Sequence, residues 1–181
     1  MKRIKAAVFL FCILLSIPAI AGGEIHQSMT VDEAYAAIPH QRTVFDTSAA
    51  KMDVQEKKFL AIFFSLIDKA VAEKVIRLKS IGGHSVATDN YDAILAKLGE
   101  LQVPDKLEKV YRLVMEAVQE QRQYLAQLVK GGESFSSGAP LVQSSHGNLV
   151  AAYGELMRLF PAEGQSNKQS FFDYLCALDF I

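Results

Sequence analysis

The stretch MDVQEKKFLAIFFSLIDKAVAEKVIRLKSI, residues 52–81, decides the fold because it predicts one long central helix. It covers about eight helical turns and contains neither Gly nor Pro. Apolar residues at helical spacing give it one wide face: Phe59, Leu60, Ile62, Phe63, Leu66, Ile67, Ala70, Val71 and Val75. A face this wide must be covered on several sides, which predicts the central helix of a bundle.

The rest of the chain repeats helical spacing and shows no alternating strand pattern of useful length. We expect four principal helices, near 49–81, 105–130, 140–160 and 168–180, and two short ones, near 30–38 and 89–102. Their connections are short, which favours antiparallel neighbours. The sequence therefore predicts an all-α fold, an up-and-down helical bundle of about four principal helices plus two short ones.

Polar residues ahead of two principal helices are candidate N-caps. Asp46, Thr47 or Ser48 is expected to cap the long helix, which would then start near residue 49. Ser166 or Asn167 is expected to cap the last helix. Both expectations rest on the ability of these short side chains to accept hydrogen bonds from the free N–H groups of a first helical turn.

Residues 1–21 have the pattern of a targeting segment. Three basic residues, an apolar run over 6–17, Pro18 and the small-x-small sequence Ala19-Ile20-Ala21 follow one another. The pattern predicts a signal peptide cleaved before Gly22, with an uncleaved anchor as the alternative. The mature part, residues 22–181, is then a single helical-bundle domain with no second membrane span, exported most simply to a periplasm.

Charge and cysteine content narrow the class of partner. The net charge is −1, and loss of the three basic residues of segment 1–21 takes it to −4. A mildly acidic chain without a basic cluster is a poor candidate for binding nucleic acid. Only Cys176 remains after cleavage, so no intramolecular disulfide is expected. We expect Cys176 to be buried and inert, with an intermolecular disulfide or a reactive thiol as alternatives.

No pattern of metal ligands or catalytic residues appears. The four histidines, at 26, 40, 84 and 146, include no two at helical ligand spacing, and no Cys-x-x-Cys-His sequence is present. The acids of the long helices suggest solvated faces: Asp53, Glu56, Glu73, Glu108, Glu116 and Glu120. We expect no enzyme activity, no metal and no cofactor. A noncovalent haem held by His146 and one of three methionines, Met52, Met115 or Met157, is the alternative.

Two polar residues interrupt apolar stripes and suggest a ligand pocket. Gln121 and His146 each replace an apolar residue near the middle of a regular helical stripe. If the two helices face each other, these groups meet inside the bundle, beside the small or polar residues Ser144 and Asn148. Such a pair lines a pocket, fixes helix register or lies at a partly exposed edge.

The non-periodic link YAAIPHQRTVFD, residues 35–46, is a candidate partner-binding segment. Tyr35, His40, Arg42 and Phe45 combine aromatic, titratable and cationic groups of the kind common at protein interfaces. Alternatively, Tyr35 and Phe45 pack on the bundle while Arg42 pairs with an acid.

These features predict an exported, non-enzymatic helical bundle that binds a protein partner or a small ligand, in an immunity, adaptor or chaperone-like role. The alternative is a haem- or metal-carrying bundle that uses His146. The fold alone does not decide between these two functions.

Overall fold

The computed structural model describes Ile25 and residues 29–80, 90–131 and 135–179 of the chain. Within these ranges the chain is all-α, with no strand. The elements are α1 (Val31–Ala36), α2 (Val54–Ser80), α3 (Asn90–Gly99), the 3-10 turn η1 (Asp105–Leu107), α4 (Glu108–Gly131), α5 (Pro140–Leu159) and α6 (Gln165–Leu178). The expected signal segment 1–21, His26 and His84 lie outside the described residues. No described helix combines the length and apolar character needed to cross a membrane.

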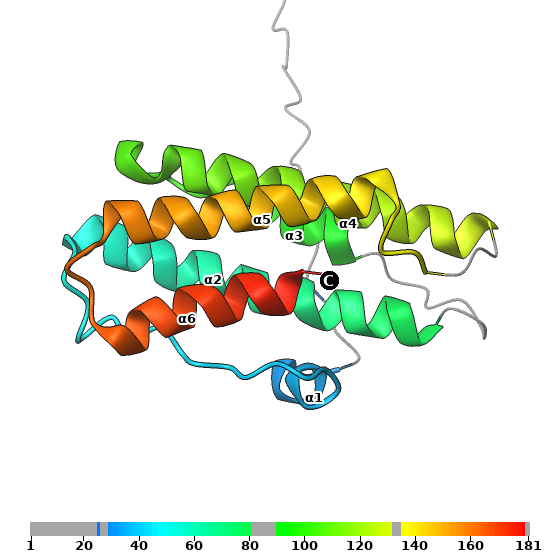
Figure 1. Ribbon diagram of the computed structural model, residues 1–181, viewed down its shortest axis with the longest axis horizontal. Helices are drawn as coiled ribbons and strands as arrows, with labels where there is room; N and C mark the ends of the chain where they lie inside the picture. The colour runs from blue at the N-terminus through cyan, green and yellow to red at the C-terminus, as the bar shows by residue number, and fades with distance from the viewer. Residues whose placement is uncertain (1–24, 26–28, 81–89, 132–134, 180–181) are drawn as a thin grey trace, which may run out of the picture.

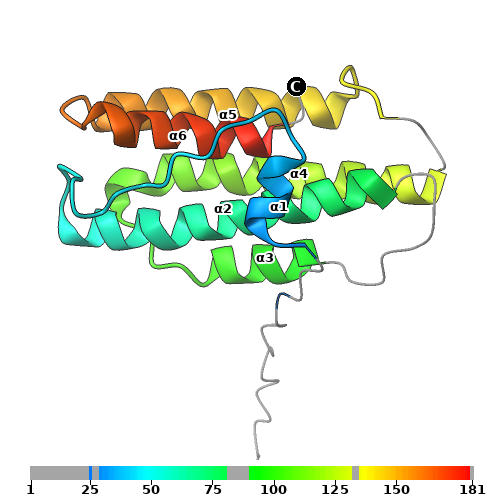
Figure 2. The same ribbon diagram turned by 90° about the horizontal axis from the view of Figure 1, so that it is seen from below.

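Four long helices form a closed ring in the order α2, α4, α5, α6, and each packs on the next. Successive helices from α2 to α6 run in alternating directions along the molecule (Figure 1). The short helix α3 packs on α2 and α4, and α1 crosses the surface of α2 (Figure 2). The all-α bundle with four principal and two short helices is therefore confirmed.

An aromatic cluster fills the core between α2 and α6. The Phe64 ring stacks on the Tyr174 ring with centroids 4.4 Å apart and an interplanar angle of 3°. Phe45 and Phe171 pack against Phe64 at centroid distances of 5.6 and 5.8 Å. The α2 face is buried as expected except at Ile62, whose exposed fraction is 51%. Including Ile62 in that face was wrong, because no helix of the described residues covers this side of α2.

The long helix starts later than expected, at Val54 and not near residue 49. Asp53 caps it, because its Oδ1 accepts hydrogen bonds of 2.8 Å from the backbone N–H groups of Gln55 and Glu56. Glu56 Oε2 accepts a bond of 3.1 Å from the Asp53 N–H, which completes a capping box. Asp46 caps a tight turn instead, by accepting bonds from the N–H groups of Ser48 and Ala49.

The last helix also begins elsewhere than expected. Its N-cap is Gly164, and the helix starts at Gln165. Asn167 is buried inside the first turn, where its side chain bonds to the backbone of Asp46, accepting from the N–H at 2.9 Å and donating to the C=O at 3.0 Å. Asn167 is therefore not the N-cap of α6, and its side chain instead connects α6 to the backbone of Asp46.

Two acids expected on solvated faces are buried. Glu73 is fully buried, and it accepts hydrogen bonds from Arg77 Nε at 3.0 Å and from Asn90 Nδ2 at 2.9 Å. Glu56 is buried at the start of α2 and forms an ion pair of 2.9 Å with Lys106. Buried carboxylates need such partners, because burial removes their hydration.

Candidate functional site

The inward face of α5 is turned only slightly from the expected stripe of Val142, His146, Leu149, Tyr153, Leu156 and Phe160, because four of these residues, Val142, Leu149, Leu156 and Phe160, are buried. Val142, Ser145, Leu149, Ala152 and Leu156 are buried. His146 and Tyr153 lie at the edge of this face, and the exposed fraction of the His146 side chain is 39%. Small Ser145 and Ala152 permit close approach of α4 to α5, which explains the rotation.

Gln121 meets Ser145 and not His146 inside the bundle. Its Nε2 donates to Ser145 Oγ at 3.1 Å and to the carbonyl oxygen of Leu178 at 2.8 Å. Its Oε1 is buried and has no hydrogen-bond partner in the described part of the chain. The expected pairing of Gln121 with His146 is thus wrong. The carboxamide joins α4 to α5 and to the end of α6, which is the register-fixing alternative.

Ser144 and Asn148 lie on the outer seam between α4 and α5. Ser144 Oγ donates to Glu120 Oε1 at 2.5 Å, and Asn148 Nδ2 donates to Glu120 Oε2 at 3.2 Å. Neither residue lines the cavity that contains His146. These two side chains bind α5 to α4 through one carboxylate, and they do not surround His146.

A cavity of about 320 Å³ does contain His146, between α5 and α6. Its lining is mainly apolar and includes Leu149, Val150, Tyr153, Phe172 and Leu175. Val150 and Phe172 are exposed, and Phe172 packs edge-on against Tyr153 with ring centroids 5.7 Å apart. The walls therefore present apolar surface that the described part of the chain leaves exposed.

One end of this cavity is polar. His146 Nδ1 lies 2.6 Å from Asp179 Oδ2, and the exposed fraction of the Asp179 side chain is 10%. Asp179 follows the last residue of α6, so this contact also ties the end of α6 to α5. The carboxylate holds one ring nitrogen of His146 and leaves the other for a ligand.

Cys176 also lines the cavity and is only partly buried. Its Sγ lies 3.6 Å from His40 Nδ1, which brings a predicted partner-binding residue to the same site. Burial raises the pKa of the thiol, and the acidic neighbours Asp179 and Asp173 add to this shift. Cys176 is thus a thiol at neutral pH and not a thiolate.

The predicted partner-binding segment packs largely against its own bundle. Tyr35 Oη donates to Asp68 Oδ1 at 3.1 Å, and Arg42 Nη2 bonds to Asp68 Oδ2 at 2.5 Å. Arg42 also reaches Asp32 at 2.9 Å. Tyr35 and Phe45 are each only 7% exposed. This geometry corresponds to the alternative interpretation of the segment, in which the aromatic residues pack and Arg42 pairs with acids.

Side chains of α6 and the loop before it hold the backbone that follows Arg42. This segment runs alongside α6 in Figure 2. The backbone N–H groups of four residues donate to these side chains: Thr43 to Asp173 at 2.9 Å, Phe45 to Tyr174 at 3.5 Å, Asp46 to Asn167 at 2.9 Å and Lys51 to Glu163 at 2.8 Å. The segment is therefore a structural connection between α1 and α2.

Among the described residues, no three His, Cys, Asp or Glu side chains are placed to hold a metal ion. His146, Asp179 and Cys176 share one cavity, yet they do not converge as ligands. None of the methionines proposed as a second haem ligand lines the cavity.

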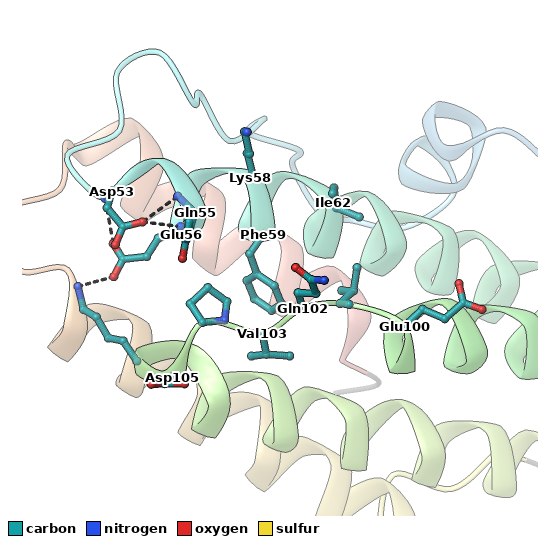
Figure 3. Close-up of a pocket in the computed structure, with 13 residues that line it drawn as sticks. Asp53, Gln55, Glu56, Lys58, Phe59, Ile62, Glu100, Gln102, Val103 and Asp105 are labelled. Atoms are coloured by element: carbon teal, nitrogen blue, oxygen red, sulfur yellow. Dashed lines mark hydrogen bonds and ion pairs between the residues drawn. The ribbon is translucent and has the colours of Figure 1, made fainter.

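A second and larger cleft was not predicted from the sequence. It lies between the first turns of α2 and the link from α3 to η1, with a volume of about 960 Å³ (Figure 3). Phe59 forms part of its floor, and Ile62, Gln102 and Glu100 lie along it. The non-helical sequence around Pro104 was the available signal, because a link that leaves the helical path leaves space beside α2.

Comparison with known proteins adds no functional information. The chain matches no family model, no curated protein and no solved structure.

Proposed function

We propose that this chain is an exported, non-enzymatic binding protein whose cavity between α5 and α6 takes a small, mostly apolar ligand. The supporting observation is the cavity itself, where apolar walls end at the hydrogen-bonded pair of His146 and Asp179. Small-ligand sites commonly combine apolar lining with a few placed polar groups.

The size of the cavity limits the ligand. Its volume of about 320 Å³ is at the lower end of the range for small-molecule sites, roughly 300–1,000 Å³. A ligand with one or two small ring systems or a short alkyl chain suits this space. Its polar group would contact the free ring nitrogen of His146, because Asp179 holds the other nitrogen.

Export is part of the proposal and rests on the sequence of residues 1–21. A basic start, a short apolar run and a small-x-small site are the usual features of a cleaved signal peptide. Periplasmic fractionation with N-terminal sequencing of the mature protein tests it. A mature chain that starts at Gly22 is expected, and a chain that keeps residues 1–21 would contradict cleavage.

The fluorescent probe N-phenyl-1-naphthylamine, which is apolar and neutral, tests the cavity. The mature protein should enhance its fluorescence in a saturable way. Val150→Asp places a charge on the exposed wall and should weaken binding about tenfold, while the control Val44→Asp, also exposed but outside the cavity, should not. Equal binding by the two variants would reject the site.

One observation favours the alternative, a haem or metal carrier. A histidine that ligates a metal usually has its other ring nitrogen held by a carboxylate or carbonyl, as Asp179 holds His146. An absorption spectrum of protein purified from the periplasm separates the two. The ligand-binding proposal predicts no Soret band, and a Soret band lost in His146→Ala would replace it.

A further inference from the structure

The cleft beside α2 combines features that a folded bundle does not need for its own stability. It lies between α2 and residues 100–106, away from the cavity of His146 (Figure 3). Its volume of about 960 Å³ is near the upper end of small-molecule sites, and it is open along one side. Such a space suits an elongated ligand.

The floor of the cleft is apolar. The Phe59 ring points into the cleft from α2 (Figure 3) and stacks on the Phe63 ring, with centroids 5.2 Å apart. Val103 lies opposite, on the link, and Ile62 continues the apolar surface outward with half of its surface exposed. This apolar surface can bind an apolar side chain of a ligand.

Two glutamines supply free amide groups at the cleft. The side chains of Gln55 and Gln102 are exposed and make no hydrogen bond in the described part of the chain. The backbone N–H groups of Gln102 and Val103 are likewise unbonded within the described ranges. A carboxamide both donates and accepts hydrogen bonds, which matches the alternating N–H and C=O groups of a peptide backbone.

The uncompensated charge of the cleft is negative. Glu56 forms an ion pair of 2.9 Å with Lys106, and the Asp53 carboxylate accepts hydrogen bonds from the N–H groups at the start of α2. Glu100 and Asp105 are exposed and have no ion pair among the described residues. Lys58 also lines the cleft, with its side chain directed outward in Figure 3, so the four acids and two lysines of the lining carry a net charge of −2. The two free carboxylates therefore favour a cationic occupant.

We propose that this cleft binds an extended peptide segment of a partner protein, in which a Lys or Arg lies next to an apolar residue. The apolar side chain contacts Phe59 and Ile62, and the cation contacts Glu100, because Asp105 lies at the opposite end of the cleft (Figure 3). The glutamine amides bond to the peptide backbone. A small organic cation would use the charges and the floor but leave these amides unbonded.

Fluorescence anisotropy of labelled peptides tests the proposal. The probe is an eight-residue peptide of alternating leucine and lysine, with both ends blocked. Two controls replace all lysines by glutamate or all leucines by serine. The leucine–lysine peptide should bind to the mature protein at least about tenfold more tightly than either control. Its affinity should fall as the salt concentration is raised, because salt screens the charges. Equal affinity of the three peptides would overturn the proposal.

Variants at exposed positions locate the site without disturbing the core. Glu100→Lys should weaken binding of the leucine–lysine peptide about tenfold, as should Ile62→Ser. The matched controls Glu116→Lys and Val44→Ser change exposed residues outside the cleft and should bind normally. An equal loss in Glu116→Lys would show attraction to the whole acidic surface and reject the cleft. The Val150→Asp variant should bind the leucine–lysine peptide normally. This test is therefore independent of the probe-binding test of the proposed function.

Discussion

Lys74 on α2 donates a hydrogen bond of 2.6 Å from its Nζ to the carbonyl oxygen of Ala177 in the last turn of α6. The same ammonium group bonds to the carbonyl oxygens of Leu178 at 3.0 Å and Asp179 at 2.5 Å. Lys74 is only 3% exposed. It therefore caps the C-terminus of α6 from inside the bundle, where free carbonyl groups and the helix dipole favour a cationic donor.

Replacing Lys74 with Met should destabilise the protein. The carbonyl groups that end α6 would lose their shared donor inside the bundle, which costs about 1–3 kcal/mol for a buried group left without a partner. Urea denaturation at pH 8, followed by circular dichroism, measures the change. Lys58→Met is the control, because Lys58 lies on the same helix but is exposed. Equal stability of the two variants would contradict a capping role for Lys74.

The contribution of Lys74 to stability should depend on pH. Burial lowers the pKa of Lys74 from 10.5 to about 7, and the carboxylate of Asp179, followed by the Cys176 side chain, opposes this shift. Between these two pH values the unfolded chain binds the proton that the native protein has lost, so the free energy of unfolding rises with pH. The slope from one group is at most about 1.4 kcal/mol per pH unit.

The comparison of wild type with Lys74→Met isolates this effect from other groups. The difference in unfolding free energy, wild type minus variant, should increase from pH 7 to pH 9 and stay level below pH 6. Denaturation curves at each pH provide the measurement. A difference that stays constant over the whole range would show that Lys74 keeps its proton in the native protein.

Arg42→Ala should destabilise the bundle by about 2 kcal/mol, less than for a fully buried ion pair. The reason is Asp68, whose side chain is only 5% exposed and would lose its ion pair with Arg42. Burial raises the pKa of Asp68, and Arg42 acts against that rise. Thermal denaturation compares this variant with Arg112→Ala, an exposed arginine on α4. A stable Arg42→Ala variant would restore the view that Arg42 serves a partner.

Asp53→Ala should lower stability by about 1 kcal/mol, the usual effect of losing an N-cap. Asp53 accepts two backbone hydrogen bonds at the start of α2. Thr47→Ala removes another residue suited to capping, but Thr47 is exposed and outside the helix, so a change within about 0.5 kcal/mol is expected. The urea midpoints of the two variants measure these effects. A larger loss of stability for Thr47→Ala than for Asp53→Ala would indicate that α2 starts earlier in the chain.

Phe64 and Phe172 each directly follow another phenylalanine, but truncating them to Ala should cause very different losses of stability. Phe64→Ala removes a fully buried ring from the cluster around Tyr174 and should cost about 3–5 kcal/mol. Phe172→Ala removes a ring that is 45% exposed and should cost less than about 1 kcal/mol. Calorimetry on both variants tests this order, and similar losses would mean that Phe172 belongs to the core.

The sequence predicted the helices well because helical spacing, Gly and Pro act locally. It did not predict which polar residues would be buried. Glu73 and Glu56 have the spacing of surface acids, yet Asn90 and Lys106 reach them from other elements. The site was predicted in part for the same reason: His146 does line a cavity, but its polar partner is Asp179 and not Gln121.

By itself, the sequence determined the all-α class and the number of helices, because both depend on contacts between residues a few positions apart. Tertiary structure alone decided the order of helices around the ring, the rotation of α5 and the burial of Lys74. It also decided the two cavities. Each of these depends on groups far apart in the chain, as Lys74 and Ala177 are, and no local pattern records which distant surface will cover a given face.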